Sequence, residues 1–179
     1  MINYITNEEL KNLTIRKSAD TLITESFNRT TYNSTFLSYS SSDLLLLPSV
    51  ISILEGHGTS VYMDRKDPRL PDKTSKETGR ILRDTIDKCK NFIMFVTDNS
   101  KDSVWVPWEL GLADGNKSSY KVAIFPSVEK SHDKEWTEQE YLGLYDRIIW
   151  GNFTDKKPEW LVWNFEEKTA VTLDEWLRR

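Results

Sequence analysis

The sequence predicts an α/β protein with a parallel sheet of five strands and helices on both faces of that sheet. Apolar, strand-like runs alternate along the 179 residues with segments whose apolar residues recur every three to four positions, which is the helical spacing. The connections between these segments are short, and strand–helix–strand units of this kind join parallel strands. Residues 91–97 are almost continuously apolar, as in a strand that is buried on both faces.

The five strands are expected at residues 35–40, 60–64, 91–97, 121–128 and 147–150. A helix lies between the first two strands. Its expected N-cap is Ser42 or Asp43, Pro48 fits its first turn, and Gly56 or Gly58 can end it. Further helices are expected over residues 76–90, from about residue 105 onward, around residues 137–147 and over residues 172–179.

Two of these helices carry residues with an expected structural role. The apolar stripe over residues 76–90 includes Cys89, which is expected to be a small core residue and not a reactive thiol. The C-terminal helix has Thr172 or Asp174 as its expected N-cap. Since Cys89 is the single cysteine, an intramolecular disulfide is excluded.

The length fits one domain with its own core, which we expect to span residues 34–179, preceded by a helical extension over residues 1–33. A formal net charge of -4 argues against sequence-independent nucleic-acid binding. The N-terminus lacks the pattern of a secretory signal, and the longest apolar run, residues 44–54, is too short to span a bilayer. We therefore expect a cytoplasmic protein with neither nucleic acid nor membrane as a partner.

Several familiar sites are absent from the sequence. It contains no phosphate-binding GxxxxGK[ST] loop, no GxGxxG dinucleotide fingerprint and no GxSxG nucleophile elbow. With two histidines, both in turn-like contexts, and one cysteine, it has no zinc-ligand spacing. No metal and no resident cofactor are therefore expected.

The expected topology brings polar residues together at one edge of the sheet. In a doubly wound sheet with strand order 2-1-3-4-5, ligands bind outside the carboxyl ends of strands 1 and 3. The first of these strands ends in Ser38, Tyr39 and Ser40, whose hydroxyls suit a sugar or a phosphate. Glu109 follows the third strand and would enter from the opposite wall, and the loop that begins at Asp64 would lie alongside.

The run SVWVPWELG places Trp105, Trp108 and Glu109 at the start of a helix, and it has two interpretations. A glutamate in the first turn of a helix interacts favourably with the helix dipole, and tryptophans are often core residues. Alternatively, the carboxylate faces a ligand and the indoles restrict water around it. The residues alone leave both interpretations open.

Three stretches in order resemble a known family. FLSYSSSD (36–43) resembles its first box, GTSVYMD (58–64) its second strand, and ILRDTIDKCKNFIMFVTDNSKDSVWVPWELG (81–111) its second helix, third strand and Ser-x-Trp…Glu-Leu signature. In this order and spacing, residues 35–150 resemble a Toll/interleukin-1 receptor (TIR) domain, whose fold is flavodoxin-like.

The resemblance implies an activity. Many bacterial and plant TIR domains, and one animal member, cleave NAD+ at the nicotinamide–ribose bond with the glutamate of a W-x-x-x-E motif, which Trp105 and Glu109 match. It implies that Glu109 is catalytic and contacts the ribose hydroxyls. The substrate-binding residues that we expect are Ser38, Tyr39, Ser40, Asp64, Arg65 and Trp105.

A chain of this size is similar to the TIR subunit of Thoeris defence systems, which makes a nucleotide messenger for a separate effector. The resemblance therefore implies NAD+ as substrate, ADP-ribose or a cyclic or conjugated ADP-ribose as product, and a homo-oligomer held by TIR–TIR contacts. Two alternatives remain open. One is a non-catalytic TIR scaffold that acts by assembly, and the other is a nucleoside deoxyribosyltransferase-like enzyme in which the carboxylate is a nucleophile.

The sequence departs from the family at two places. The loop after the second strand, residues 65–75, lacks the central glycine of many members. Ser40 and Ser41 stand where some active members have arginines, so phosphate contacts are left to the backbone or to Arg65 and Lys66. In contrast, Pro107 fits the first turn of a helix, where its missing N–H costs nothing.

Overall fold

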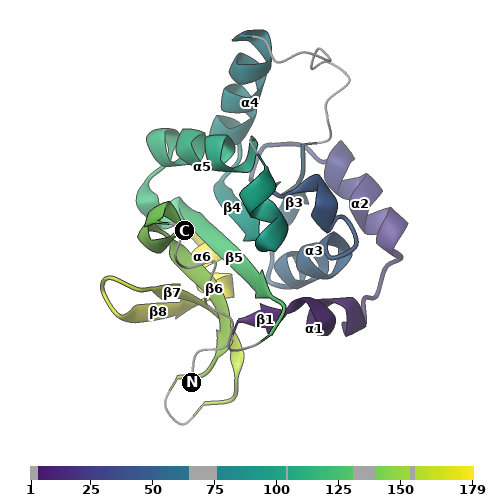
Figure 1. The fold of residues 1–179 in the computed structure, drawn as a ribbon, viewed down its shortest axis with the longest axis vertical. Helices are drawn as coiled ribbons and strands as arrows, with labels where there is room; N and C mark the ends of the chain where they lie inside the picture. The colour runs from purple at the N-terminus through teal and green to yellow at the C-terminus, as the bar shows by residue number, and fades with distance from the viewer. Residues whose placement is uncertain (1–3, 65–75, 104, 131–139, 154–155) are drawn as a thin grey trace.

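A single sheet with helices on both faces forms the protein (Figure 1). The structure, a computed structural model, describes residues 4–64, 76–103, 105–130, 140–153 and 156–179. The strands are β1 (Ile5–Thr6), β2 (Ser34–Ser38), β3 (Ser60–Tyr62), β4 (Asn91–Val96), β5 (Val122–Val128), β6 (Asp146–Gly151), β7 (Glu159–Asn164) and β8 (Thr169–Thr172). The α-helices are α1 (Asn7–Asn12), α2 (Ala19–Asn28), α3 (Leu47–Gly56), α4 (Lys76–Lys88), α5 (Trp105–Asn116) and α6 (Leu173–Arg178). Short 3-10 helices are η1 (Ser41–Asp43), η2 (Asp98–Asp102), η3 (Ser119–Lys121) and η5 (Glu140–Leu144).

The strand order is β3-β2-β4-β5-β6-β7-β8, and β1 pairs with β5 beside this path. The segment β3-β2-β4-β5-β6 is parallel throughout and reproduces the expected order 2-1-3-4-5. The sheet is larger than expected, because β7 and β8 continue it in antiparallel pairing and β1 adds a short parallel pair. The α/β class and the order of the five predicted strands are confirmed.

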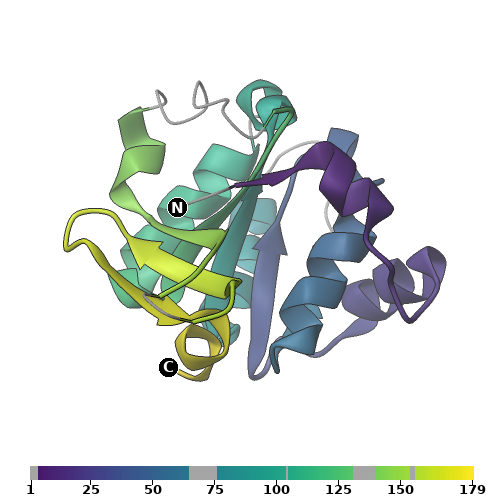
Figure 2. The ribbon, with the colours of Figure 1, turned by 90° about the horizontal axis from the view of Figure 1, so that it is seen from below.

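Alternation along the strands divides the core into two layers. Ile93 and Phe95 of β4 point to the face that α3 and α6 cover, together with Leu10 of α1 and Leu22 of α2. Phe92, Met94 and Val96 point to the opposite face, which α4 and α5 cover. Figure 2 shows these two helical layers on either side of the sheet. Because side chains alternate with period two, the same rule decides which residues at the end of β2 can meet α5.

The start of α3 differs from the expectation. Leu46 is the N-cap and makes no side-chain capping bond, and Pro48 is the second residue of the helix. Neither Ser42 nor Asp43 caps α3, because Asp43 lies in η1 and its carboxylate is bonded elsewhere. The end is as expected, since α3 stops at Gly56 and Gly58 adopts a φ of 90°, which favours glycine. The cap of α6 is also confirmed: the Thr172 hydroxyl accepts the Glu175 N–H.

The N-terminal segment adds β1 to the sheet, so it is not helical throughout as expected, and its helices α1 and α2 pack on the α3 side. Thr6 and Glu9 form a capping box at the start of α1, and Ser18 caps α2. The Ser49 hydroxyl of α3 donates to the main-chain oxygen of Leu10, which fixes α1 on α3. The division of the chain at residue 33 into an extension and a TIR domain stays a prediction. Across the part of the chain that the structure describes, no helix combines the length and the apolar character needed to cross a membrane.

Candidate active site

The candidate site lies at the carboxyl ends of β2, β3 and β4, where the strand order reverses. The chain passes from β2 to β3 on one side and returns to β4 on the other side of β2. The loops after β2 and β4 therefore diverge to opposite faces of the sheet, and in sheets of this kind the ligand-binding crevice lies between such loops. Ser38 ends β2, Asp64 follows β3 closely, and η2 leads from β4 into α5.

Ser38 and Glu109 meet in this crevice. Ser38 is two residues beyond Phe36, so its side chain points to the α5 face of the sheet. Val106 and Leu110 anchor α5 to the same face and turn Glu109 toward the end of β2. The Ser38 hydroxyl, which is almost wholly buried, donates a hydrogen bond of 2.6 Å to Oε2 of Glu109.

The carboxyl group of Glu109 has a strongly perturbed pKa. The residue keeps part of its surface exposed, but burial of the carboxyl raises its pKa from 4.5 to about 8. The hydrogen bond from Ser38 lowers the pKa, and the negative charge of Asp64 raises it. Burial is the largest of these causes, so the free protein holds a proton on Glu109 at neutral pH. A carboxyl perturbed in this way, in a crevice, is a mark of a functional site.

Two indoles stand at the start of α5. Trp105 is its first residue, and Trp108 follows one turn later, with their rings edge to face at a centroid distance of 5.5 Å. They are 38% and 39% exposed, which is high for the largest apolar side chain. Gly79 of α4 lies against the Trp108 ring, because a Cβ on Gly79 would be 3.4 Å from Cη2 of the indole. The indoles are thus held at the surface beside Glu109, and their exposure speaks against a pure core role.

The other residues expected at the site have separate contacts. The Tyr39 hydroxyl donates to the main-chain oxygen of Asp64 at 3.4 Å and so links the ends of β2 and β3. Ser40 is 6% exposed, and its main-chain oxygen accepts the Asp43 N–H. This burial leaves little of the Ser40 side chain available to a ligand. Arg65, Lys66 and the rest of the loop 65–75 lie outside the described residues.

Sequence reasoning missed a polar cluster beside the crevice. The Asp43 carboxylate accepts a hydrogen bond of 2.8 Å from the Thr97 hydroxyl and one of 2.6 Å from Nδ2 of Asn99. Asp43 is 1% exposed, and burial raises its pKa while the two hydrogen bonds lower it. The sequence does contain a signal for this cluster: Thr97 and Asn99 are polar residues directly after a buried strand, and they lie at the same edge of the sheet as Asp43.

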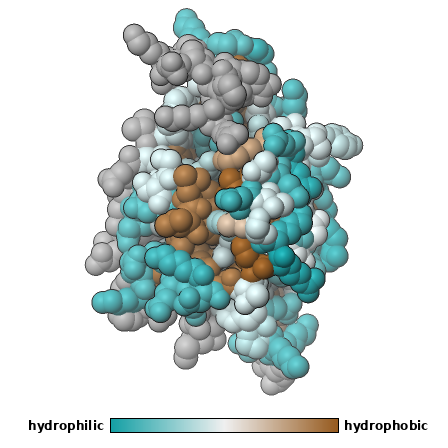
Figure 3. All heavy atoms as spheres, turned by 90° about the vertical axis from the view of Figure 1, so that its right-hand side faces the viewer, coloured by the Kyte–Doolittle hydropathy of each residue, from teal (hydrophilic) through white to brown (hydrophobic). Residues whose placement is uncertain are grey.

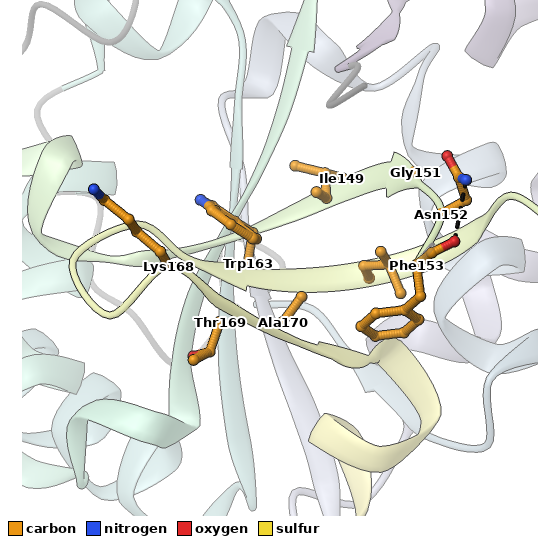
Figure 4. A pocket seen from close by; sticks show the side chains of 9 residues that line it. Ile149, Gly151, Asn152, Phe153, Trp163, Lys168, Thr169 and Ala170 are labelled. Carbon is orange, nitrogen blue, oxygen red and sulfur yellow. Dashed lines mark hydrogen bonds between the residues drawn. The ribbon is translucent and has the colours of Figure 1, made fainter. Parts of the chain in front are cut away.

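A second hollow lies at the other end of the sheet. It has a volume of about 380 Å³ and is lined by residues of β6, β7, β8 and the turns between them, among them Trp163, Lys168 and Phe153. Figure 4 shows the side chains of Lys168 and Trp163 toward one end of it and that of Phe153 toward the other. The described residues that line it include no carboxylate, histidine or cysteine. Among the described residues, no three His, Cys, Asp or Glu side chains are grouped so that they could hold a metal ion.

Comparison with known proteins identifies the family of the chain. Residues 35–160 match the family model of the TIR domain. Over 146 residues, the chain is 38% identical to a protein of Bacillus cereus (strain MSX-D12) named "Probable 3' cyclic ADP-D-ribose synthase ThsB'", an alignment that covers 80% of this chain and 75% of that protein. The chain therefore belongs to the TIR domain family.

Proposed function

We propose that this protein cleaves the nicotinamide–ribose bond of NAD+ and converts the ADP-ribosyl group to a cyclic ADP-ribose messenger in Thoeris-like antiviral signalling. The observation that carries the proposal is the buried carboxyl of the partly exposed Glu109, held by Ser38 at the carboxyl ends of β2 and β4 with two exposed indoles beside it. The name of the Bacillus cereus relative, a cyclic ADP-ribose synthase, supports the cyclic product.

The chemistry needs one carboxylate. The C–N bond to the ribose breaks, its electron pair leaves with neutral nicotinamide, and an oxocarbenium-like centre develops on the sugar. The Glu109 carboxylate stabilises that positive charge, as carboxylates do in glycoside hydrolysis. A hydroxyl of the same molecule then bonds to the sugar carbon and loses its proton, which gives a cyclic product; attack by water gives ADP-ribose instead.

Glu109 must be ionised for this role, although its pKa of about 8 keeps it mostly protonated in the free protein at neutral pH. Bound NAD+ can restore the ionised form of Glu109, because the nicotinamide ring of NAD+ is a cation. A positive charge near a carboxyl favours its ionised form. The crevice therefore favours a cationic leaving group over a neutral one, and binding releases a proton.

The remaining residues fit supporting roles in the proposal. Trp105 lies one helical turn before Glu109 on the same side of α5 and is exposed enough to contact a flat ring. Opposite α5, we propose that Ser38 and Asp64 contact the sugar and that Tyr39 supports Asp64 through its hydrogen bond to the main-chain oxygen. The buried Ser40 would contribute through its backbone. Arg65 is the residue that we propose for contact with the phosphates.

Assembly belongs to the same proposal, with homo-oligomers formed through TIR–TIR contacts and a separate effector that binds the product. Leu44 and Leu45, between η1 and α3, are 46% and 84% exposed. Figure 3 shows hydrophobic side chains gathered on one face of the molecule among hydrophilic ones. Exposed apolar surface of this kind marks contact sites between proteins. It also favours the second candidate function, a TIR scaffold without catalysis.

Product analysis by chromatography and mass spectrometry, after incubation of concentrated protein with NAD+, tests the proposal. The cyclic product has the mass of ADP-ribose less one water, so the two outcomes are separable. A cyclic product supports a messenger synthase, and ADP-ribose alone supports a hydrolase. Absence of both products at concentrations where the protein is oligomeric supports the scaffold.

A further inference from the structure

Asp43 connects two loops that start from different strands. It lies in η1, five residues after Ser38, and its carboxylate is bonded by Thr97 and Asn99, which follow β4. The contact joins the segments that follow β2 and β4, and the Ser38–Glu109 bond joins the end of β2 to the helix that follows β4. A buried carboxylate of this kind is retained only where its hydrogen bonds are made.

The segment from Thr97 to α5 is itself well bonded. The Thr97 hydroxyl accepts the Asn99 N–H, and the Ser100 hydroxyl accepts the Thr97 N–H, so the two residues cap η2. The Ser103 hydroxyl then accepts the Val106 N–H in the first turn of α5. A force on Thr97 or Asn99 is therefore transmitted through short, hydrogen-bonded turns to the helix that carries Glu109.

We propose that Asp43 is a positioning residue for the cleavage reaction: by holding η1 against η2 it sets the separation of β2 and α5, and with it the place of Glu109 opposite Ser38. The inference rests on the proposed function and adds a residue to it. Asp43 acts through Thr97 and Asn99 and does not touch the substrate. Displacement of a catalytic group by about 1 Å can cost about 100-fold in rate.

The most direct test exchanges the donor and the acceptor of the hydrogen bond between Asn99 and Asp43. Asn99→Asp, at an exposed position, replaces a donor by a second carboxylate that faces Asp43 across 2.6 Å. Adding Asp43→Asn restores one donor and one acceptor across the same contact, while the oxygen of the introduced amide still accepts from Thr97. Asn116→Asp is the control, since it places the same charge at an exposed position of α5.

We expect Asn99→Asp to lower kcat for NAD+ cleavage by about tenfold or more with a smaller change in KM. The double variant should recover to within about threefold of the native rate, and Asn116→Asp should match the native protein. Equal rates for Asn99→Asp and Asn116→Asp, or no recovery in the double variant, would overturn the proposal. Asn99→Ala, which removes one donor only, replaces Asn99→Asp if that variant melts below the assay temperature.

A second readout does not depend on activity. The titration of the Glu109 carboxyl, followed by ¹³C NMR, should move from a midpoint near 8 toward ordinary values in Asn99→Ala, which breaks the contact with Asp43 without adding a charge. The reason is that burial, the largest cause of the raised pKa, weakens when the walls separate. If the native protein does not cleave NAD+, the proposed function fails while this titration still decides the positioning role. An unchanged midpoint in Asn99→Ala would refute it.

Discussion

The Ser38 hydroxyl and the Glu109 carboxyl, 71 residues apart in the chain, are joined by a hydrogen bond of 2.6 Å across the crevice at the carboxyl ends of the strands. This bond favours the ionised carboxylate, whereas burial and the charge of Asp64 favour the protonated form. The charge on Glu109 at a given pH is thus the result of opposed influences from named neighbours. The contributions of Ser38 and Asp64 can each be removed separately by substitution.

Replacing Ser38 by Ala should raise the pKa of Glu109, because a donor to the ionised form is lost. The profile of kcat/KM for NAD+ against pH reports the pKa values of the free enzyme, so its acidic limb should move to higher pH. A hydrogen bond with a net value of about 1 kcal/mol corresponds to an activity loss of about fivefold below the midpoint. An acidic limb that moves to lower pH would contradict the assigned role of Ser38.

Replacing Asp64 by Asn should shift the acidic limb in the opposite direction. The charge of Asp64 raises the pKa of Glu109, so its removal favours ionisation at lower pH. If Asp64 also binds the substrate, the maximum value of kcat/KM falls as well. The midpoint of the acidic limb does not depend on that maximum. The measurement is the same pH profile, and equal directions for the Ser38 and Asp64 variants would show that the two residues do not act through Glu109.

The stability of the protein should depend on pH through Glu109. The folded pKa, about 8, lies above the ordinary value of 4.5, so the folded state binds this proton more tightly than the unfolded state does. The resulting stabilisation is fully present below about pH 4.5 and is lost as the pH rises through 8. Urea unfolding at several pH values should therefore show a decline in the free energy of unfolding that is less steep in Glu109→Gln. Parallel curves for the two proteins would contradict the raised pKa.

The indole of Trp105 should matter for activity beyond its effect on stability. Trp105→Ala removes a partly buried side chain that contacts Trp108 edge to face, so the free energy of unfolding should fall by about 1 to 2 kcal/mol. The value of kcat/KM for NAD+ should fall by about tenfold or more if the indole contacts the substrate or restricts water. Tyr120→Ala, at an aromatic residue that is 49% exposed after α5, is the matched control. Similar activities for the two variants would leave Trp105 without a role in the site.

The order of the central strands is predictable because each strand–helix–strand unit follows a fixed handedness and short connections. That order alone is enough to expect Ser38 and Glu109 on facing walls. The strands β7, β8 and β1 are not predicted by the sequence pattern. The run around Trp160 and Trp163 has no clear period, and β1 is only two residues long, so its pairing with Ser127 and Val128 is decided by tertiary contact.

Asp43 shows why the rest of the site could not be predicted from the sequence. An aspartate shortly before an apolar helix has the local pattern of an N-cap, and the sequence therefore predicts a cap there. The structure instead buries Asp43 against Thr97 and Asn99, 54 and 56 residues further along the chain. Local preference cannot distinguish a capping carboxylate from one that is bonded at long range.

The central claim, that Glu109 carries out the cleavage of NAD+, is tested most directly by nicotinamide release. Native protein and Glu109→Gln, which keeps the size of the side chain and removes its charge, are compared at equal concentration with NAD+. We predict steady release of nicotinamide by the native protein and a loss of about 100- to 1000-fold in the variant, the range found when a main electrostatic stabiliser is removed. Equal release by both proteins would contradict the assignment of Glu109.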